Sequence, residues 1–162
     1  MGLARAATLL HATELRDDRS ILDLVQLVER AWGAPDVLIN NAGVYPRGQL
    51  LEIPADEWDR IMDVNLRAPF LLTREMARLM IGAGVRGSVV NITSGAARNL
   101  RTGSVPYSTS KAALERLTAG LALELAPHRI RVNAVSPGFA PGSTVSPLSP
   151  AYVEGMLARI PL

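Results

Sequence analysis

The run Val37-Leu38-Ile39 is entirely apolar and stops abruptly at the polar, glycine-containing turn 40–43. A strand with one solvated face alternates apolar and polar residues, whereas a strand covered on both faces is continuously apolar. Strands covered on both faces are typical of parallel sheets, whose strands are joined by helical crossovers. The run therefore predicts a parallel α/β protein.

The rest of the chain alternates strand-like and helix-like segments, as such crossovers require. The expected strands are 7–12, 37–39, 88–92 and 130–135. The expected helices are 20–32, 55–80, 107–125 and 151–160, the second with a kink near 64–65 caused by Pro69. We predict a three-layer, Rossmann-like parallel sheet of about four strands with helices on both faces. The sheet is incomplete, and residues 1–162 form a single partial domain.

Charge and cysteine content exclude several classes of function. The 17 Lys and Arg residues against 15 Asp and Glu residues leave a net charge of +2, with no block of like charge. We therefore expect neither a nucleic-acid partner nor a membrane surface as partner. The absence of cysteine excludes disulfides and thiolate metal sites, and we expect no metal. No apolar segment has the length of a membrane span or signal peptide, so we expect a soluble, cytoplasmic protein.

The stretch Gly82–Gly87, GAGVRG, matches the dinucleotide-binding pattern G-x-G-x-x-G letter for letter. A phosphate-binding loop follows a strand and opens a helix, which points backbone N–H groups at the phosphates. Here a predicted helix precedes the glycines and a predicted strand follows them. We therefore interpret GAGVRG as a helix stop.

The single lysine of the chain, Lys111, follows Tyr107 by four residues. On a helix this spacing places both side chains on one face, where a cation favours tyrosinate over tyrosine. The pair is therefore a candidate for general acid/base catalysis, although both residues could share a solvated helix face by chance. Ser94 follows the predicted strand 88–92, and its hydroxyl is expected in the same crevice beyond the carboxyl ends of the strands.

These residues, together with the turn 40–43, Asn65, the segment Tyr107-Ser108-Thr109-Ser110-Lys111 and Pro137-Gly138, resemble the short-chain dehydrogenase/reductase family. The resemblance implies an NAD(P)-dependent oxidoreductase that interconverts an alcohol and a ketone, or reduces a related carbonyl. The implied partner is a small-molecule alcohol or carbonyl substrate. The family also implies self-association into a dimer or tetramer.

The resemblance implies a role for each catalytic candidate. Tyr107 would be the general acid/base, and Ser94 would orient the substrate oxygen. Lys111 would ease the loss of the Tyr107 proton and hold the ribose hydroxyls next to the nicotinamide. Asn65, at the expected kink, would free a backbone carbonyl for a water that links Lys111 to solvent.

The family pattern also implies residues that contact the cofactor. Asn40 and Gly43 would border it, and Glu14 would lie near the adenine. Asn41 could instead brace the strand ends, and Glu14 could be an ordinary exposed acid. The full expected set is Glu14, Asn40, Ala42, Gly43, Tyr107, Lys111, Pro137, Gly138 and Ala140.

The chain departs from the family pattern before residue 7, where no strand and glycine-rich turn match the family's phosphate-binding segment. The choice between NAD and NADP is therefore unreadable, and two hypotheses stay open. The chain is an enzyme, or it is a truncated, non-catalytic fragment or interaction module that cannot bind the dinucleotide alone. The 37–39 strand either pairs with the 7–12 strand or leaves an exposed edge, which would invite pairing with another chain. The substrate is either modest and uncharged or anionic, because Arg98 and Arg101 could attract an anion.

Overall fold

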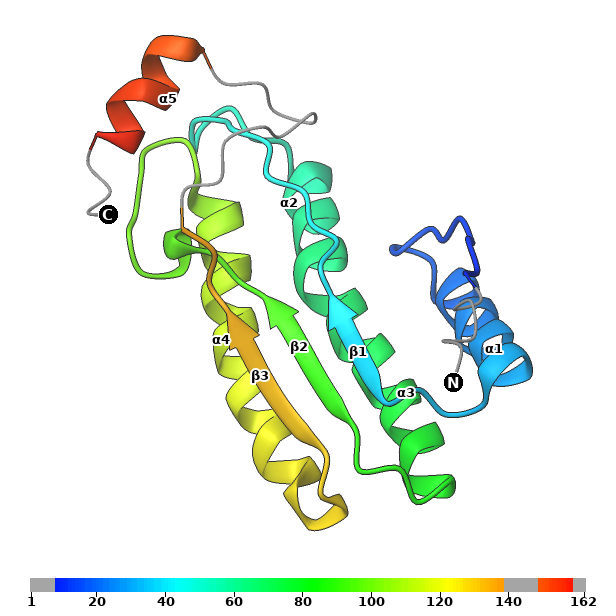
Figure 1. The fold of residues 1–162 in the computed structure, drawn as a ribbon. Coiled ribbons are helices and arrows are strands. Elements are labelled where there is room, and N and C mark those ends of the chain that lie inside the picture. Colours follow the sequence, from blue (N-terminus) through cyan, green and yellow to red (C-terminus); the bar gives the residue numbers. More distant parts are fainter. Residues whose placement is uncertain (1–7, 139–148, 159–162) are drawn as a thin grey trace.

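The computed structural model describes residues 8–138 and 149–158, and its centre is a parallel sheet (Figure 1). Strand β2 (Ser88–Ile92) lies between β1 (Val37–Asn40) and β3 (Arg131–Val135). Both pairings are parallel, with Val37 opposite Ser88 and Ser88 opposite Arg131. The predicted α/β class and incomplete parallel sheet are confirmed.

Helices α3 (Ala68–Gly82) and α4 (Val105–Leu125) lie behind the strands in Figure 1, and α1 (Asp18–Trp32) packs against α3. The short α5 (Pro150–Leu157) lies near the carboxyl ends of the strands. The described helices thus cover one face of the sheet, and on β1 the side chains of Val37 and Ile39 are 54% and 59% exposed. The third layer is not formed by the residues that the structure describes.

The strand expected over 7–12 is not formed: residues 8–13 have no strand structure, and residue 7 lies outside the described part. A strand there would need the edge of β1 as its hydrogen-bonding partner. Instead the next element, α1, packs through Ile21 and Val25 directly onto α3. In the described part of the chain the sheet therefore has three strands, and the alternative of an exposed β1 edge is the one observed.

Helix α1 begins earlier than predicted. Its N-cap is Asp17, whose carboxylate accepts a hydrogen bond from the Arg19 N–H at 3.1 Å. Ser20, where the helix was expected to begin, lies inside α1, and its hydroxyl accepts a hydrogen bond from the Glu14 N–H at 2.9 Å. Asp17 and Ser20 are both short polar residues of the kind that precede helices, so the local pattern did not distinguish between them.

The long helix predicted over 55–80 is interrupted where the kink was expected. Helix α2 (Ala55–Met62) runs into a π-helix, η1 (Asp63–Arg67), which continues into α3. The Ala68 N–H donates to the Asp63 carbonyl, five residues back. Pro69 has no N–H to offer the carbonyl of Asn65, four residues earlier, so the regular helical pairing fails at this point.

The GAGVRG stretch is a helix stop, as predicted. Helix α3 ends at Gly82, and the Val85 N–H donates to the Met80 carbonyl at 2.8 Å. Gly84 has a φ of +68°, the left-handed conformation that favours glycine after a helix. Strand β2 then begins at Ser88, so no helix N-terminus faces these glycines.

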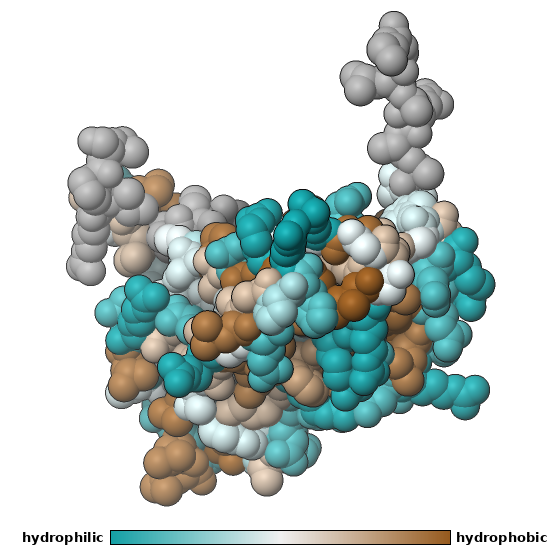
Figure 2. Space-filling model, turned by 90° about the horizontal axis from the view of Figure 1, so that it is seen from below, coloured by the Kyte–Doolittle hydropathy of each residue, from teal (hydrophilic) through white to brown (hydrophobic). Residues whose placement is uncertain are grey.

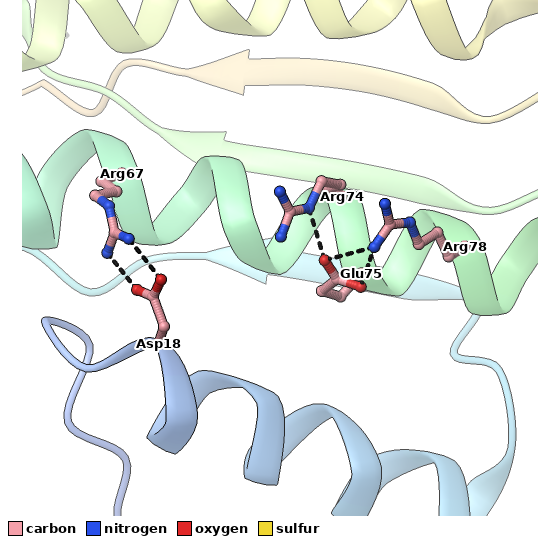
Figure 3. Close-up of polar contacts among 5 residues, drawn as sticks. All are labelled: Asp18, Arg67, Arg74, Glu75 and Arg78. Atoms are coloured by element: carbon pink, nitrogen blue, oxygen red, sulfur yellow. Dashed lines mark hydrogen bonds and ion pairs between the residues drawn. The ribbon is translucent and has the colours of Figure 1, made fainter.

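One ion pair, between Asp18 and Arg67, links α1 to the π-helix, and two others lie within α3 (Figure 3). Arg67 Nη2 donates to Asp18 Oδ2 at 2.7 Å, and this hydrogen bond lowers the pKa of Asp18. On α3, burial alone would raise the pKa of Glu75, but hydrogen bonds from Arg74 and Arg78 lower it.

At the end of the molecule where the strands begin, hydrophilic and hydrophobic residues are interspersed (Figure 2). The candidate site lies at the opposite end.

Candidate active site

A cavity of about 340 Å³ opens at the carboxyl ends of β1 and β2, beside the first turns of α4. Its lining brings together six of the residues predicted from the sequence: Gly43, Ser94, Tyr107, Lys111, Pro137 and Gly138. A second cavity of about 460 Å³ shares Ser94 and Tyr107 with it. Ser94 and Tyr107 therefore line both cavities.

Lys111 is the buried cation of this region, with only 4% of its surface exposed. Its Nζ donates to the carbonyl of Ile92 at 2.8 Å and lies 5.9 Å from the centre of the Tyr107 ring. Burial lowers the pKa of Lys111. An ammonium group has three N–H donors, so Ile92 leaves two for other oxygens.

Ser94 is held by the short turn that follows β2. Its hydroxyl oxygen accepts a hydrogen bond from the Ala96 N–H at 3.2 Å and so caps the 3₁₀-helix η2 (Gly95–Ala97). That contact uses a lone pair, and the hydroxyl hydrogen can still be donated. Ser94 therefore offers one donor to the cavity that Tyr107 also lines.

Asn65 is completely buried and ties the π-helix to the β1 turn. Its amide exchanges two hydrogen bonds with the backbone of Val44, each 2.8 Å long. Its Nδ2 also donates to Ser110 Oγ at 3.0 Å, and Ser110 donates to the Tyr107 carbonyl at 2.7 Å. Asn65 therefore joins the π-helix, the β1 turn and the first turns of α4.

Asn40 has a bracing position in the structure. Its Nδ2 donates to Asn91 Oδ1 at 2.8 Å and to Thr73 Oγ1 at 3.2 Å, which links β1 to β2 and α3. Asn91 continues the chain of contacts by donating to Thr118 Oγ1 on α4 at 2.9 Å. Asn40 and Ala42 line a separate cavity of about 280 Å³ between α1, β1 and α3, while Asn41 is exposed and lines both this cavity and the one at Tyr107.

Two other residues from the predicted cofactor set are not brought to the cavity by the described structure. Glu14 is exposed, and its carboxylate accepts a hydrogen bond from the nearby Arg16 N–H at 2.9 Å. Glu14 lines neither the Tyr107 cavity nor the one at Asn40. Ala140 lies outside the described residues.

Sequence reasoning missed several residues that line the site. Tyr45 packs edge-on against Tyr107, with ring centres 6.1 Å apart, and Arg47 and Tyr152 line the larger cavity. They come from loops and a helix far apart in the sequence, so no spacing pattern reveals them. Asn91, which contacts Asn40 and Thr118, did give a signal, because it is a polar residue between the apolar residues Val90 and Ile92 of β2.

The fit of a nicotinamide cofactor can be tested on two details of the cavity. Lys111 keeps two free donors beside Tyr107, which suits a pair of ribose hydroxyls. A Cβ added at Gly43 would lie in van der Waals contact, at 3.4 Å, with both Lys111 Nζ and Asn65 Oδ1, so the glycine leaves the space beside the lysine open. The residues present therefore fit the nicotinamide-riboside end of a dinucleotide.

In the described ranges, 8–138 and 149–158, no helix combines the length and the apolar character needed to cross a membrane.

Comparison with known proteins identifies relatives of this chain. Residues 3–151 match the short chain dehydrogenase family model. Gluconate 5-dehydrogenase of Gluconobacter oxydans (strain 621H) is 37% identical over 126 residues, covering 78% of this chain and 49% of that protein. This chain spans about half the length of this and similar curated relatives.

Two solved structures share the fold and were obtained with nicotinamide cofactors. A 4-hydroxyisoleucine dehydrogenase complexed with NADH and succinate has a TM-score of 0.74 at 35% identity, covering 77% of this chain and 58% of that one. A metagenomic short-chain oxidoreductase in complex with NADP has a TM-score of 0.75 at 40% identity, covering 80% and 59%. Because the family model matches residues 3–151, which is most of this chain, the chain belongs to the short chain dehydrogenase family.

Proposed function

We propose that this chain supplies the catalytic side chains of an NAD(P)-dependent oxidoreductase that interconverts an alcohol and a ketone, or reduces a related carbonyl. The single observation that supports this most is the shared cavity of Ser94, Tyr107 and Lys111. Family membership and relatives complexed with NADH or NADP support it independently. Neither observation favours one of the two cofactors.

In this proposal Tyr107 exchanges a proton with the substrate oxygen through its hydroxyl, acting as general acid or base. Ser94 donates a hydrogen bond to the same oxygen and so holds it near the Tyr107 hydroxyl. The positive charge of Lys111 stabilises tyrosinate while the proton is away. The bound nicotinamide would supply or accept the hydride.

The cofactor would be held by residues of the cavity and its surroundings. Lys111 would donate to the ribose hydroxyls, and Gly43 would let the ribose approach. Asn65 would position this region through Val44, and the carbonyl that Pro69 leaves without a helical partner would bind the water that links Lys111 to solvent. Glu14, Asn40, Ala42, Pro137, Gly138 and Ala140 remain predicted contacts from the family pattern.

Self-association is part of the proposal. A largely apolar hollow of about 440 Å³ between η1, the start of α3 and α4 is lined by Met62, Asp63, Leu66, Arg67, Phe70, Ala113 and Leu117, and Phe70 is 38% exposed. A second copy of the chain would cover this surface. Sedimentation of the purified chain, compared with that of Phe70→Asp, would test this expectation.

A cytoplasmic location also remains a prediction, which cell fractionation would test.

The alternative is a non-catalytic fragment or interaction module that cannot bind the dinucleotide alone. It is favoured by the described glycine-rich turn, which follows a helix and so cannot present a helix N-terminus to phosphates. Calorimetric titrations of the whole chain with NADH, NADPH and reduced nicotinamide mononucleotide separate the two. Binding of any of them that Lys111→Met weakens would support the cofactor site, with Thr109→Val, exposed on the same helix, as control. No heat with any of the three at millimolar concentration would support the alternative.

A further inference from the structure

Two arginines line the larger cavity together with the candidate catalytic side chains. Arg47 lies in the loop after β1, and Arg101 lies in the loop between η2 and α4. Both line the 460 Å³ cavity that also contains Ser94 and Tyr107. Their side chains are exposed, so they are accessible to a ligand that enters this cavity.

The loops of these two arginines are joined through their backbones. The Gly48 N–H, next to Arg47, donates to the Gly103 carbonyl at 3.1 Å. Gly103 has a φ of +73°, which a residue with a side chain adopts only with strain, and a Cβ at Gly48 would come within 2.8 Å of the Ile53 side chain. This hydrogen bond therefore joins the two loops that carry the arginines.

No carboxylate neutralises these charges within the described part of the chain. No Asp or Glu lines the cavity, and neither Arg47 nor Arg101 forms an ion pair there. Arg98, three residues before Arg101, does pair with Glu115, at 3.3 Å. Arg101 instead donates to the neutral hydroxyl of Tyr152 at 3.2 Å. The cavity thus contains two guanidinium groups whose charge is not balanced by a neighbour.

We propose that the substrate of this site has a negatively charged group, a carboxylate or a phosphate, which Arg47 and Arg101 bind. Guanidinium groups bind both anions through charge-assisted hydrogen bonds. The inference rests on the proposed oxidoreductase function, since it places the anionic group of the substrate at one side of the cavity and its alcohol or carbonyl toward Ser94 and Tyr107. A fixed anion would then orient the reacting oxygen.

The test is a binding titration of the whole chain without cofactor, followed by 1H–15N NMR. The probes are L-threonate and L-threitol, which share carbon skeleton and internal hydroxyls but differ in a carboxylate against a CH2OH group, and sn-glycerol 3-phosphate. We expect at least one anion to bind about tenfold more tightly than threitol. Arg47→Gln and Arg101→Gln should each weaken that binding about tenfold, and Arg98→Gln should leave it unchanged.

Binding of the phosphate alone identifies phosphate as the charged group, and binding of threonate alone identifies carboxylate. Equal binding of threitol and both anions, no binding of either anion, or anion binding unchanged in both Arg47→Gln and Arg101→Gln would overturn the inference. Circular dichroism of the variants checks that these exposed substitutions leave the fold intact. Because the titration needs neither cofactor nor catalysis, a chain that binds anions through Arg47 and Arg101 but does not bind NADH or NADPH would contradict the proposed function while still showing the anion site.

Discussion

Asn65 and Val44 exchange a reciprocal pair of hydrogen bonds, amide to backbone, at 2.8 Å each. The pair joins the π-helix η1 to the turn that ends β1, so the position of Gly43 beside Lys111 depends on Asn65, which lies 21 positions after Val44 in the sequence.

Replacing Asn65 by Ala should therefore destabilise the chain. The substitution leaves the Val44 N–H and carbonyl without partners and removes the donor to Ser110. We expect the free energy of unfolding to fall by about 2–3 kcal/mol. Denaturant unfolding measures this, with Asn133→Ala, at an exposed position of β3, as a control expected within about 0.5 kcal/mol of the wild type. Equal stabilities for the two variants would contradict the bracing role of Asn65.

The buried hydrogen bonds from Asn40 through Asn91 to Thr118 predict that the same Thr→Val substitution is more destabilising at Thr118 than at an exposed threonine of α4. Thr118→Val keeps the shape of the side chain but leaves Asn91 Nδ2 without its acceptor, so about 1–2 kcal/mol of stability should be lost. Thr109→Val makes the same chemical change at an exposed position of α4 and should have little effect. Thermal and urea unfolding of both variants give the comparison. A Thr118→Val chain as stable as Thr109→Val would show that this hydrogen bond contributes nothing.

The ion pair between Asp18 and Arg67 predicts a pH dependence at the acid end. The pKa of Asp18 is lowered in the folded chain, so its contribution is present above the unfolded value of 3.8 and is lost as pH falls through the lowered folded value. The wild type should therefore be more stable than Asp18→Asn near pH 7, and the difference should shrink toward about pH 3. Urea midpoints across this range measure it. Asp59→Asn, another exposed acid, should show a smaller change. A difference that grows on acidification would contradict this assignment.

The burial of Lys111 predicts that stability also depends on pH at the alkaline end of the scale. Its pKa is lowered by burial, so between the folded value and the unfolded value of 10.5 the unfolded chain binds more protons than the folded chain. Stability from this group therefore rises with pH in that window. The unfolding free energy of the wild type minus that of Lys111→Met should increase as pH approaches about 10. A flat difference would mean that Lys111 is not desolvated in the folded chain.

Local patterns in the sequence were sufficient to predict strands β1, β2 and β3, the helix stop at GAGVRG and the helix interruption near Asn65. Apolar runs, glycine context and Pro69 act over a few residues, and these effects survive folding. The strand expected over 7–12 is not formed, although the edge of β1 is free in the described part of the chain, because a short apolar run does not by itself determine pairing with a distant strand.

The candidate site was predictable where helical spacing or a strand end determines position, as for Ser94, Tyr107 and Lys111. Arg47 and Tyr152 were missed because they reach the cavity from separate loops and helices, and only the packing of those elements brings them there. The bracing contacts of Asn40 depend equally on the packing of β1 against β2 and α3.

The proposed function makes Tyr107 the proton donor and acceptor of a hydride-transfer reaction. The direct measurement is the oxidation of NADH and NADPH by the whole chain with a panel of neutral and anionic ketones, for the wild type and for Tyr107→Phe. We expect ketone-dependent oxidation by the wild type and a loss of at least about 100-fold in Tyr107→Phe, because the phenylalanine ring cannot transfer a proton. Cofactor oxidation that is absent from the wild type, or that Tyr107→Phe supports equally well, would contradict it.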